Sequence, residues 1–142
     1  MGTVIQTPAG GTNMRIALDI NGINHKSGLG YYLRLLVSGL AAYDRENEYL
    51  LYSHGWGAPP SLAGLDLPAG GNFRQIHIKV PETLALVAEY KLSAGLTERL
   101  LAKHAIDVFH GPANIVPLLR SIPSVLTMHH YFRKGSPFCR ST

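Results

Sequence analysis

Two kinds of apolar pattern alternate along this chain. Short stretches that are continuously or alternately apolar predict five β-strands, at about residues 16–20, 48–53, 73–80, 106–110 and 123–128. Apolar residues spaced three and four apart predict helices at about residues 30–43 and 81–103, with Gly95 as a candidate break in the second. Strands that alternate with helices predict an α/β fold, a Rossmann-like parallel sheet with right-handed crossovers and helices on both faces.

The loop after the first predicted strand carries the first candidate chemistry. Asn21-Gly22 breaks the strand, and Ser27-Gly28-Leu29-Gly30 leads into the helix. Glycines there let backbone N–H groups approach an anion, which a helix N-terminus also favours. The full dinucleotide pattern fails because Leu33 takes the place of its third glycine. A tight turn with nothing bound therefore stays open as the alternative.

Two further positions have competing interpretations. Asp19, inside the apolar first strand, is expected to be a buried, hydrogen-bonded carboxyl that organises the loop rather than a catalytic base. Residues 55–72 form a long loop with five glycines and three prolines, a composition that disfavours helix and strand. Trp56 in this loop either closes over a substrate or packs against the edge of the sheet.

Composition and charge narrow the class of protein. The 142 residues predict one domain at residues 14–142, after a flexible leader at residues 1–13. The net charge is +4, but the Lys and Arg residues are scattered, so we expect no nucleic-acid partner. A solvated surface is the expectation, with contact with an anionic membrane surface as an alternative.

Cysteine usage and hydropathy indicate the cellular compartment in which the protein resides. The single Cys139 excludes an internal disulfide and fits a reducing environment. No apolar run approaches the roughly 20 residues that span a bilayer, and the start of the chain lacks the apolar middle of a signal peptide. The sequence thus predicts a cytoplasmic protein, with the inner membrane surface as the alternative location.

Several histidines follow predicted strands. Ligands of open parallel sheets bind at the carboxyl ends of the strands, where the strand order reverses. His110 and His129 end the fourth and fifth strands, so they face the first loop if the first and fourth strands are neighbours. A backbone hydrogen bond is the alternative role for His110, and a structural role is the alternative for His129. Adjacent strand residues point to opposite faces, so His129 and His130 make a poor metal pair, and no metal site is predicted. Surface positions are expected for the remaining candidates His54, His77 and His104.

Five short motifs in order resemble the N-terminal half of family 4 glycosyltransferases, which have the GT-B architecture of two Rossmann-like domains. They are Arg-Ile-Ala-Leu-Asp, Ser-Gly-Leu-Gly-Tyr, Asp-Arg-Glu-Asn-Glu-Tyr, Ile-Asp-Val-Phe-His-Gly-Pro-Ala-Asn and Pro-Ser-Val-Leu-Thr-Met-His, at residues 15–19, 27–31, 44–49, 106–114 and 123–129. The resemblance, closest to the mannosyltransferase-like members, implies transfer of a sugar from a nucleotide-sugar donor to a hydroxyl of a sugar, glycolipid or polysaccharide acceptor, with retention. No cofactor besides the donor is implied.

The same resemblance implies roles for individual residues. Gly28, Leu29 and Gly30 would lie beside the donor diphosphate. His129 would match the family histidine that touches the transferred sugar. His110 and Asn114 would line the acceptor side of the cleft.

The chain also departs from the family pattern. His130 stands where the family usually has Asp, and nothing matches the Glu-rich motif of the second GT-B domain. The resemblance therefore predicts an N-terminal domain that is incomplete after the fifth strand, with the C-terminal GT-B domain missing. The alternative is a non-catalytic Rossmann-like module that binds a phosphorylated ligand or a protein partner.

Overall fold

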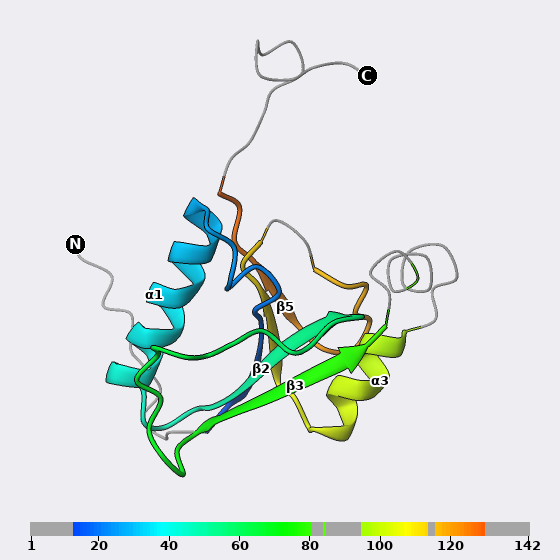
Figure 1. The fold of residues 1–142 in the computed structure, drawn as a ribbon. Helices are drawn as coiled ribbons and strands as arrows, with labels where there is room; N and C mark the ends of the chain where they lie inside the picture. Colours follow the sequence, from blue (N-terminus) through cyan, green and yellow to red (C-terminus); the bar gives the residue numbers. More distant parts are fainter. Residues whose placement is uncertain (1–12, 81–83, 85–94, 114–115, 130–142) are drawn as a thin grey trace, which may run out of the picture.

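The structure is a computed structural model that describes residues 13–80, 84, 95–113 and 116–129. Strands β1 (Arg15–Asp19), β2 (Glu48–Gly55), β3 (Phe73–Lys79), β4 (Val108–Gly111) and β5 (Ser124–Leu126) form one parallel sheet in the order β3-β2-β1-β4-β5 (Figure 1). Helices α1 (Gly28–Tyr43) and α3 (Leu96–Lys103) alternate with these strands. The predicted Rossmann-like α/β class is confirmed.

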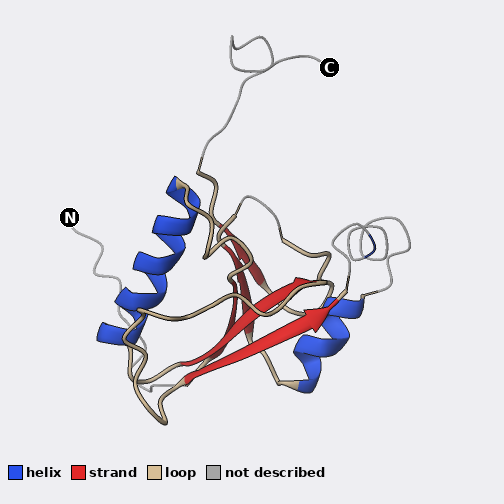
Figure 2. Cartoon of the chain, in the orientation of Figure 1, coloured by secondary structure: helices blue, strands red, loops and turns tan. Residues whose placement is uncertain are grey.

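The two helices lie on opposite faces of the sheet (Figure 2), and each face has its own core. On one face, Leu33 and Val37 of α1 pack with Leu18 and Leu51 of the two central strands. On the other face, Leu101 of α3 is fully buried in a second cluster of apolar strand residues, Ala17, Leu50, Tyr52 and Phe109 among them. Because both faces of β1 and β2 are covered, these strands are continuously apolar in sequence.

The strand order reverses at β1. The chain moves outward from β1 to β2 and β3, then crosses back to place β4 on the other side of β1 and β5 beyond it. Leu18 of β1 is therefore the register partner of His110 of β4. The first and fourth strands are thus neighbours, which was the condition for His110 and His129 to face the first loop. The carboxyl ends of β1 and β4 meet where ligands of such sheets bind.

Element boundaries agree with the sequence patterns within a few residues. The alternating third strand is an edge strand, as predicted. The fourth strand begins later than expected because the N–H of Ile106 donates to the Leu101 carbonyl at the end of α3. Gly95 precedes α3 with a left-handed φ of 58°, so α3 begins directly after the glycine at which the sequence predicted a break. The rest of the helix expected at 81–103 and most of the leader lie outside the described residues.

The long loop at residues 55–72 is held by leucines rather than by its tryptophan. Leu62, Leu65 and Leu67 pack against the α1 core, and Arg34 of α1 donates to the Ala63 carbonyl over 2.8 Å. Trp56 is 75% exposed, so the interpretation that it packs against the sheet edge is wrong. In the part of the chain that the structure describes, no helix is long and apolar enough to cross a membrane.

Candidate functional site

The carboxyl end of β1 is organised by two polar side chains. The carboxylate of Asp19 accepts the Asn21 N–H over 2.9 Å, and burial raises the pKa of this carboxyl. The Asn21 side chain in turn bridges to β2, because its amide oxygen accepts the His54 N–H and its NH₂ donates to His54 Nδ1. The expectation that Asp19 organises the first loop is confirmed, and Asn21 fastens that loop to the neighbouring strand.

Two of the three histidines expected on the surface are instead half-buried and hydrogen-bonded near the carboxyl ends of β2 and β3. His54 is half-buried in the Asn21 bridge. His77 is half-buried as well, between the Ser53 hydroxyl at 3.0 Å and the Gly57 carbonyl at 3.1 Å. Their partners lie on other strands and loops, which strand periodicity alone does not reveal. His104 is exposed, as expected.

The two glycines of the first loop differ in what surrounds them. Helix α1 begins at Gly28 with Ser27 as its N-cap, whose hydroxyl accepts the Gly30 N–H over 3.4 Å. A Cβ on Gly30 would lie 1.9 Å from the His25 carbonyl oxygen, whereas one on Gly28 would meet no atom within 4 Å. The fold itself therefore requires glycine at position 30, and position 28 is open. The Leu29 side chain is partly buried against the α1 core.

His110 extends from β4 on the same face of the sheet as α1. Its Nε2 lies 2.8 Å from the hydroxyl of Thr127, directly after β5. Burial lowers the pKa of this imidazole below its ordinary 6.5, so the ring is neutral at physiological pH. A neutral imidazole beside a hydroxyl both donates and accepts hydrogen bonds, which suits recognition of sugar hydroxyls.

His129 joins three elements. Its Nε2–H donates to the Pro112 carbonyl, just after β4, over 2.6 Å. Its ring meets the ring of Tyr32 edge-on, with centroids 4.6 Å apart and an interplanar angle of 77°. Tyr32 belongs to the second turn of α1. The residue after β5 is thus held against both the first helix and the loop after β4.

We call His110, Thr127, His129 and Tyr32 the histidine edge. Sequence reasoning identified both histidines but missed Thr127 and Tyr32. A signal for Thr127 was present, because it lies two residues from His129 and so shares its face in an extended chain. Tyr32 gave no such signal, since its contact spans almost the whole domain. Asn114, the other predicted acceptor-side residue, and His130 lie outside the described residues.

A second polar cluster, the Asp44 turn of residues 44–49, connects α1 to β2. The Asp44 carboxylate accepts the Asn47 N–H, the Asn47 side-chain NH₂ and the Tyr49 hydroxyl, the last over 2.6 Å. These donors hold the pKa of Asp44 well below its ordinary value. Burial and the neighbouring carboxylate raise the pKa of Tyr49. This motif of the resemblance thus closes a turn through its own side chains.

Among the residues the structure describes, no three His, Cys, Asp or Glu side chains are grouped so that they could hold a metal ion. Comparison of the chain with protein-family models, with curated protein sequences and with solved structures finds no match in any of the three. What the fold and the site define is therefore a Rossmann-like α/β domain with a polar edge at its strand-order reversal.

Proposed function

We propose that this chain is the acceptor-side half of a retaining glycosyltransferase that uses a nucleotide-sugar donor. The observation that carries the proposal is the convergence at the histidine edge. Side chains from α1, β4 and the segment after β5 meet where the strand order reverses, although Tyr32 and His129 are nearly a hundred residues apart. This is the position at which open parallel sheets bind ligands.

The donor diphosphate is assigned to the start of α1. The first N–H groups of a helix have no partner within the helix, and the helix dipole favours an anion there. Gly28 leaves room for such a group because nothing lies within 4 Å of its Cβ position. Gly30 acts indirectly, since its close approach to His25 sets the shape of the loop.

His129 is assigned to the transferred sugar and His110 to the acceptor side. The Pro112 carbonyl and the Tyr32 ring fix the orientation of the His129 imidazole, so contact between this ring and a sugar costs little reordering. The neutral His110 and the Thr127 hydroxyl offer a donor–acceptor pair for a second hydroxyl group.

The proposal predicts weak binding by this chain alone. In the GT-B architecture the second domain supplies the contacts to the base and ribose, so residues 1–142 should bind nucleotide sugars weakly and transfer no sugar. Calorimetry with a panel of nucleotide sugars, combined with size-exclusion chromatography and light scattering, tests this. A well-folded monomer with micromolar affinity for a nucleotide sugar would instead support the alternative, a self-sufficient binding module.

A further inference from the structure

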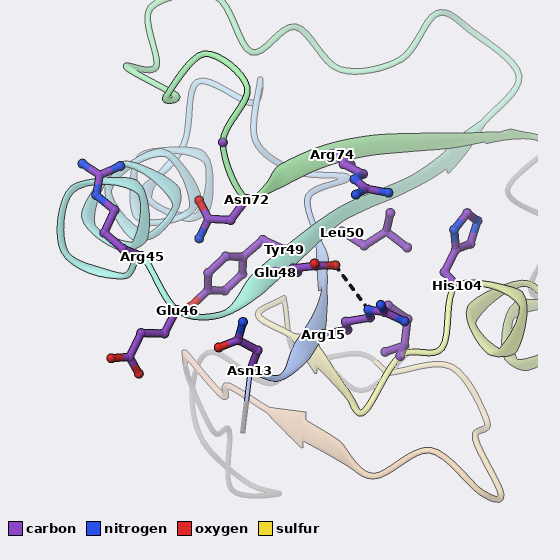
Figure 3. Close-up of a pocket in the computed structure, with 12 residues that line it drawn as sticks. Asn13, Arg15, Arg45, Glu46, Glu48, Tyr49, Leu50, Asn72, Arg74 and His104 are labelled. Atoms are coloured by element: carbon purple, nitrogen blue, oxygen red, sulfur yellow. Dashed lines mark hydrogen bonds and ion pairs between the residues drawn. The ribbon is translucent and has the colours of Figure 1, made fainter. Parts of the chain in front are cut away.

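A cavity of about 230 Å³ lies at the amino-terminal edge of the sheet, the edge opposite the histidine edge (Figure 3). It is separate from every residue assigned to sugar transfer. Its floor is formed by two nearly buried apolar side chains, Leu50 and Ile106. Its polar lining includes Arg15, Arg74 and His104.

The sheet register brings the cationic side chains to one face. Arg15 is the register partner of Glu48, and Leu50 is the register partner of Arg74. Register partners on parallel strands point to the same face, and Leu50 belongs to the core on the α3 side. Arg15 and Arg74 lie two strands apart and two residues apart in register, so their backbones are separated by about 12 Å. His104 approaches from the C-terminal end of α3.

Figure 3 shows Arg15, Arg74 and His104 around Leu50, with Arg45 and Glu46 extending away on the far side of Tyr49. The guanidinium of Arg15 is partly neutralised, because its Nε lies 3.2 Å from the Glu48 carboxylate.

Arg74 and His104 are not neutralised in this way. Within the described ranges, neither side chain forms a hydrogen bond or an ion pair. Across the whole lining, three arginines face two glutamates, so the cavity carries a positive excess even with His104 neutral.

We propose that this cavity binds a phosphate group. Arg15 of β1 and Arg74 of β3 both line the cavity, and a tetrahedral anion bound there has enough oxygens to accept from both guanidinium groups. A carboxylate is satisfied by one arginine in bidentate geometry. The apolar floor of Leu50 and Ile106 excludes water from one side, which strengthens charge-assisted hydrogen bonds. The source of the phosphate group is either a small phosphorylated solute or a lipid headgroup.

The experiment titrates the full chain with inorganic phosphate, and with acetate at the same ionic strength, and follows the melting temperature and the amide NMR signals of Arg15, Arg74 and His104. A ligand that binds only the folded state raises the melting temperature. We expect phosphate to raise it and to move these signals more than acetate does. Arg74→Gln should weaken phosphate binding about tenfold, the effect of losing a charge-assisted hydrogen bond.

Arg99→Gln is the matched control, because it removes the same charge from an exposed position on α3 outside the cavity lining. Equal responses to phosphate and acetate, or equal losses in the two variants, would overturn the proposal. Sedimentation with phosphatidylcholine vesicles, with and without phosphatidic acid, separates the two sources. If the chain sediments with vesicles only when they contain phosphatidic acid and only when Arg74 is present, the phosphate group is a lipid headgroup. If the chain binds soluble phosphate but does not sediment with either kind of vesicle, the phosphate group belongs to a small solute.

Discussion

The Asp44 turn and the histidine edge are both polar clusters at the ends of strands, yet they are built differently. In the Asp44 turn, the Asp44 carboxylate satisfies donors that all lie within five residues of it, and Met14 and Asn72 reach the turn from further away, through Asn47 and the turn carbonyls. At the histidine edge, each contact joins residues at least 17 positions apart. The network around Asp44 holds the connection between α1 and β2 in shape. The sequence motif at residues 44–49 therefore has a structural explanation and needs no ligand. A convergence of distant side chains closes no single turn, so we look there for function.

The largest expected effect concerns the histidine edge. In the two-domain protein that the resemblance implies, His129→Ala should lower turnover roughly ten- to a thousandfold, as when a hydrogen bond to a transition-state group is lost. The same substitution at His130 should cost much less. Steady-state kinetics of the two variants checks this. Greater damage from His130→Ala would mean that the alignment of this strand end is off by one.

Within the first loop, two substitutions should distinguish packing from ligand access. Gly30→Ala places a Cβ against the His25 carbonyl oxygen and should destabilise the fold by about 1–3 kcal/mol or more, as overpacking does. Gly28→Ala meets no atom and should leave thermal unfolding nearly unchanged. A comparison of melting temperatures decides the matter. Equal effects of the two changes would show that the described loop packing does not govern stability.

For the Asp44 turn, the prediction concerns stability and its pH dependence. Asp44→Asn should cost roughly 1 kcal/mol at pH 7, since its charge-assisted hydrogen bonds are weakened. The lowered pKa of Asp44 means that its contribution is complete above its ordinary value of 3.8 and is lost as the pH falls below it.

The difference in unfolding free energy between wild type and Asp44→Asn should therefore shrink in acid. Chemical denaturation at pH 7 and at pH 3 measures it, with Asp66→Asn at an exposed loop position as the charge control. A difference that stays constant between the two pH values would contradict the role of the carboxylate.

The smallest effect concerns His110. Burial lowers its pKa, so the neutral ring is favoured by folding, and this contribution is present above the ordinary 6.5 and lost as the pH falls. An NMR titration of the imidazole signals should give His110 a midpoint below 6.5. A midpoint above 6.5 would mean that the folded protein stabilises the charged ring, which would contradict the effect of burial.

Local sequence patterns were sufficient for the architecture. The apolar runs located all five strands, the alternation of residues 73–80 marked an edge strand, and Gly95 marked the start of α3. These features depend on periodicity and on backbone conformation, which neighbouring residues determine. Asp19 was also interpreted correctly, because its hydrogen-bond partner is two residues away.

Features that depend on tertiary contact could not be predicted. The need for glycine at position 30 comes from the approach of His25, and the burial of His54 comes from Asn21, 33 residues away. For Trp56 the error has the opposite sign. One interpretation of the sequence buried its side chain against the edge of the sheet, but the loop leaves it exposed. The cationic cavity escaped notice because Arg15, Arg74 and His104 are scattered in sequence.

The central claim is that recognition of the nucleotide sugar belongs to the start of α1 and the histidine edge, and not to the Asp44 turn, four of whose residues line the cationic cavity. NMR spectra of the amide and imidazole groups, recorded during titration with nucleotide sugars and with the corresponding nucleoside diphosphates, test it most directly. An Arg74→Gln background weakens the cationic cavity as a competing phosphate site. We predict that signals of Gly28, Tyr32 and His129 move, and that His129 responds only when the sugar is present. Signals that move in the Asp44 turn, with the histidine edge unchanged, would contradict the account.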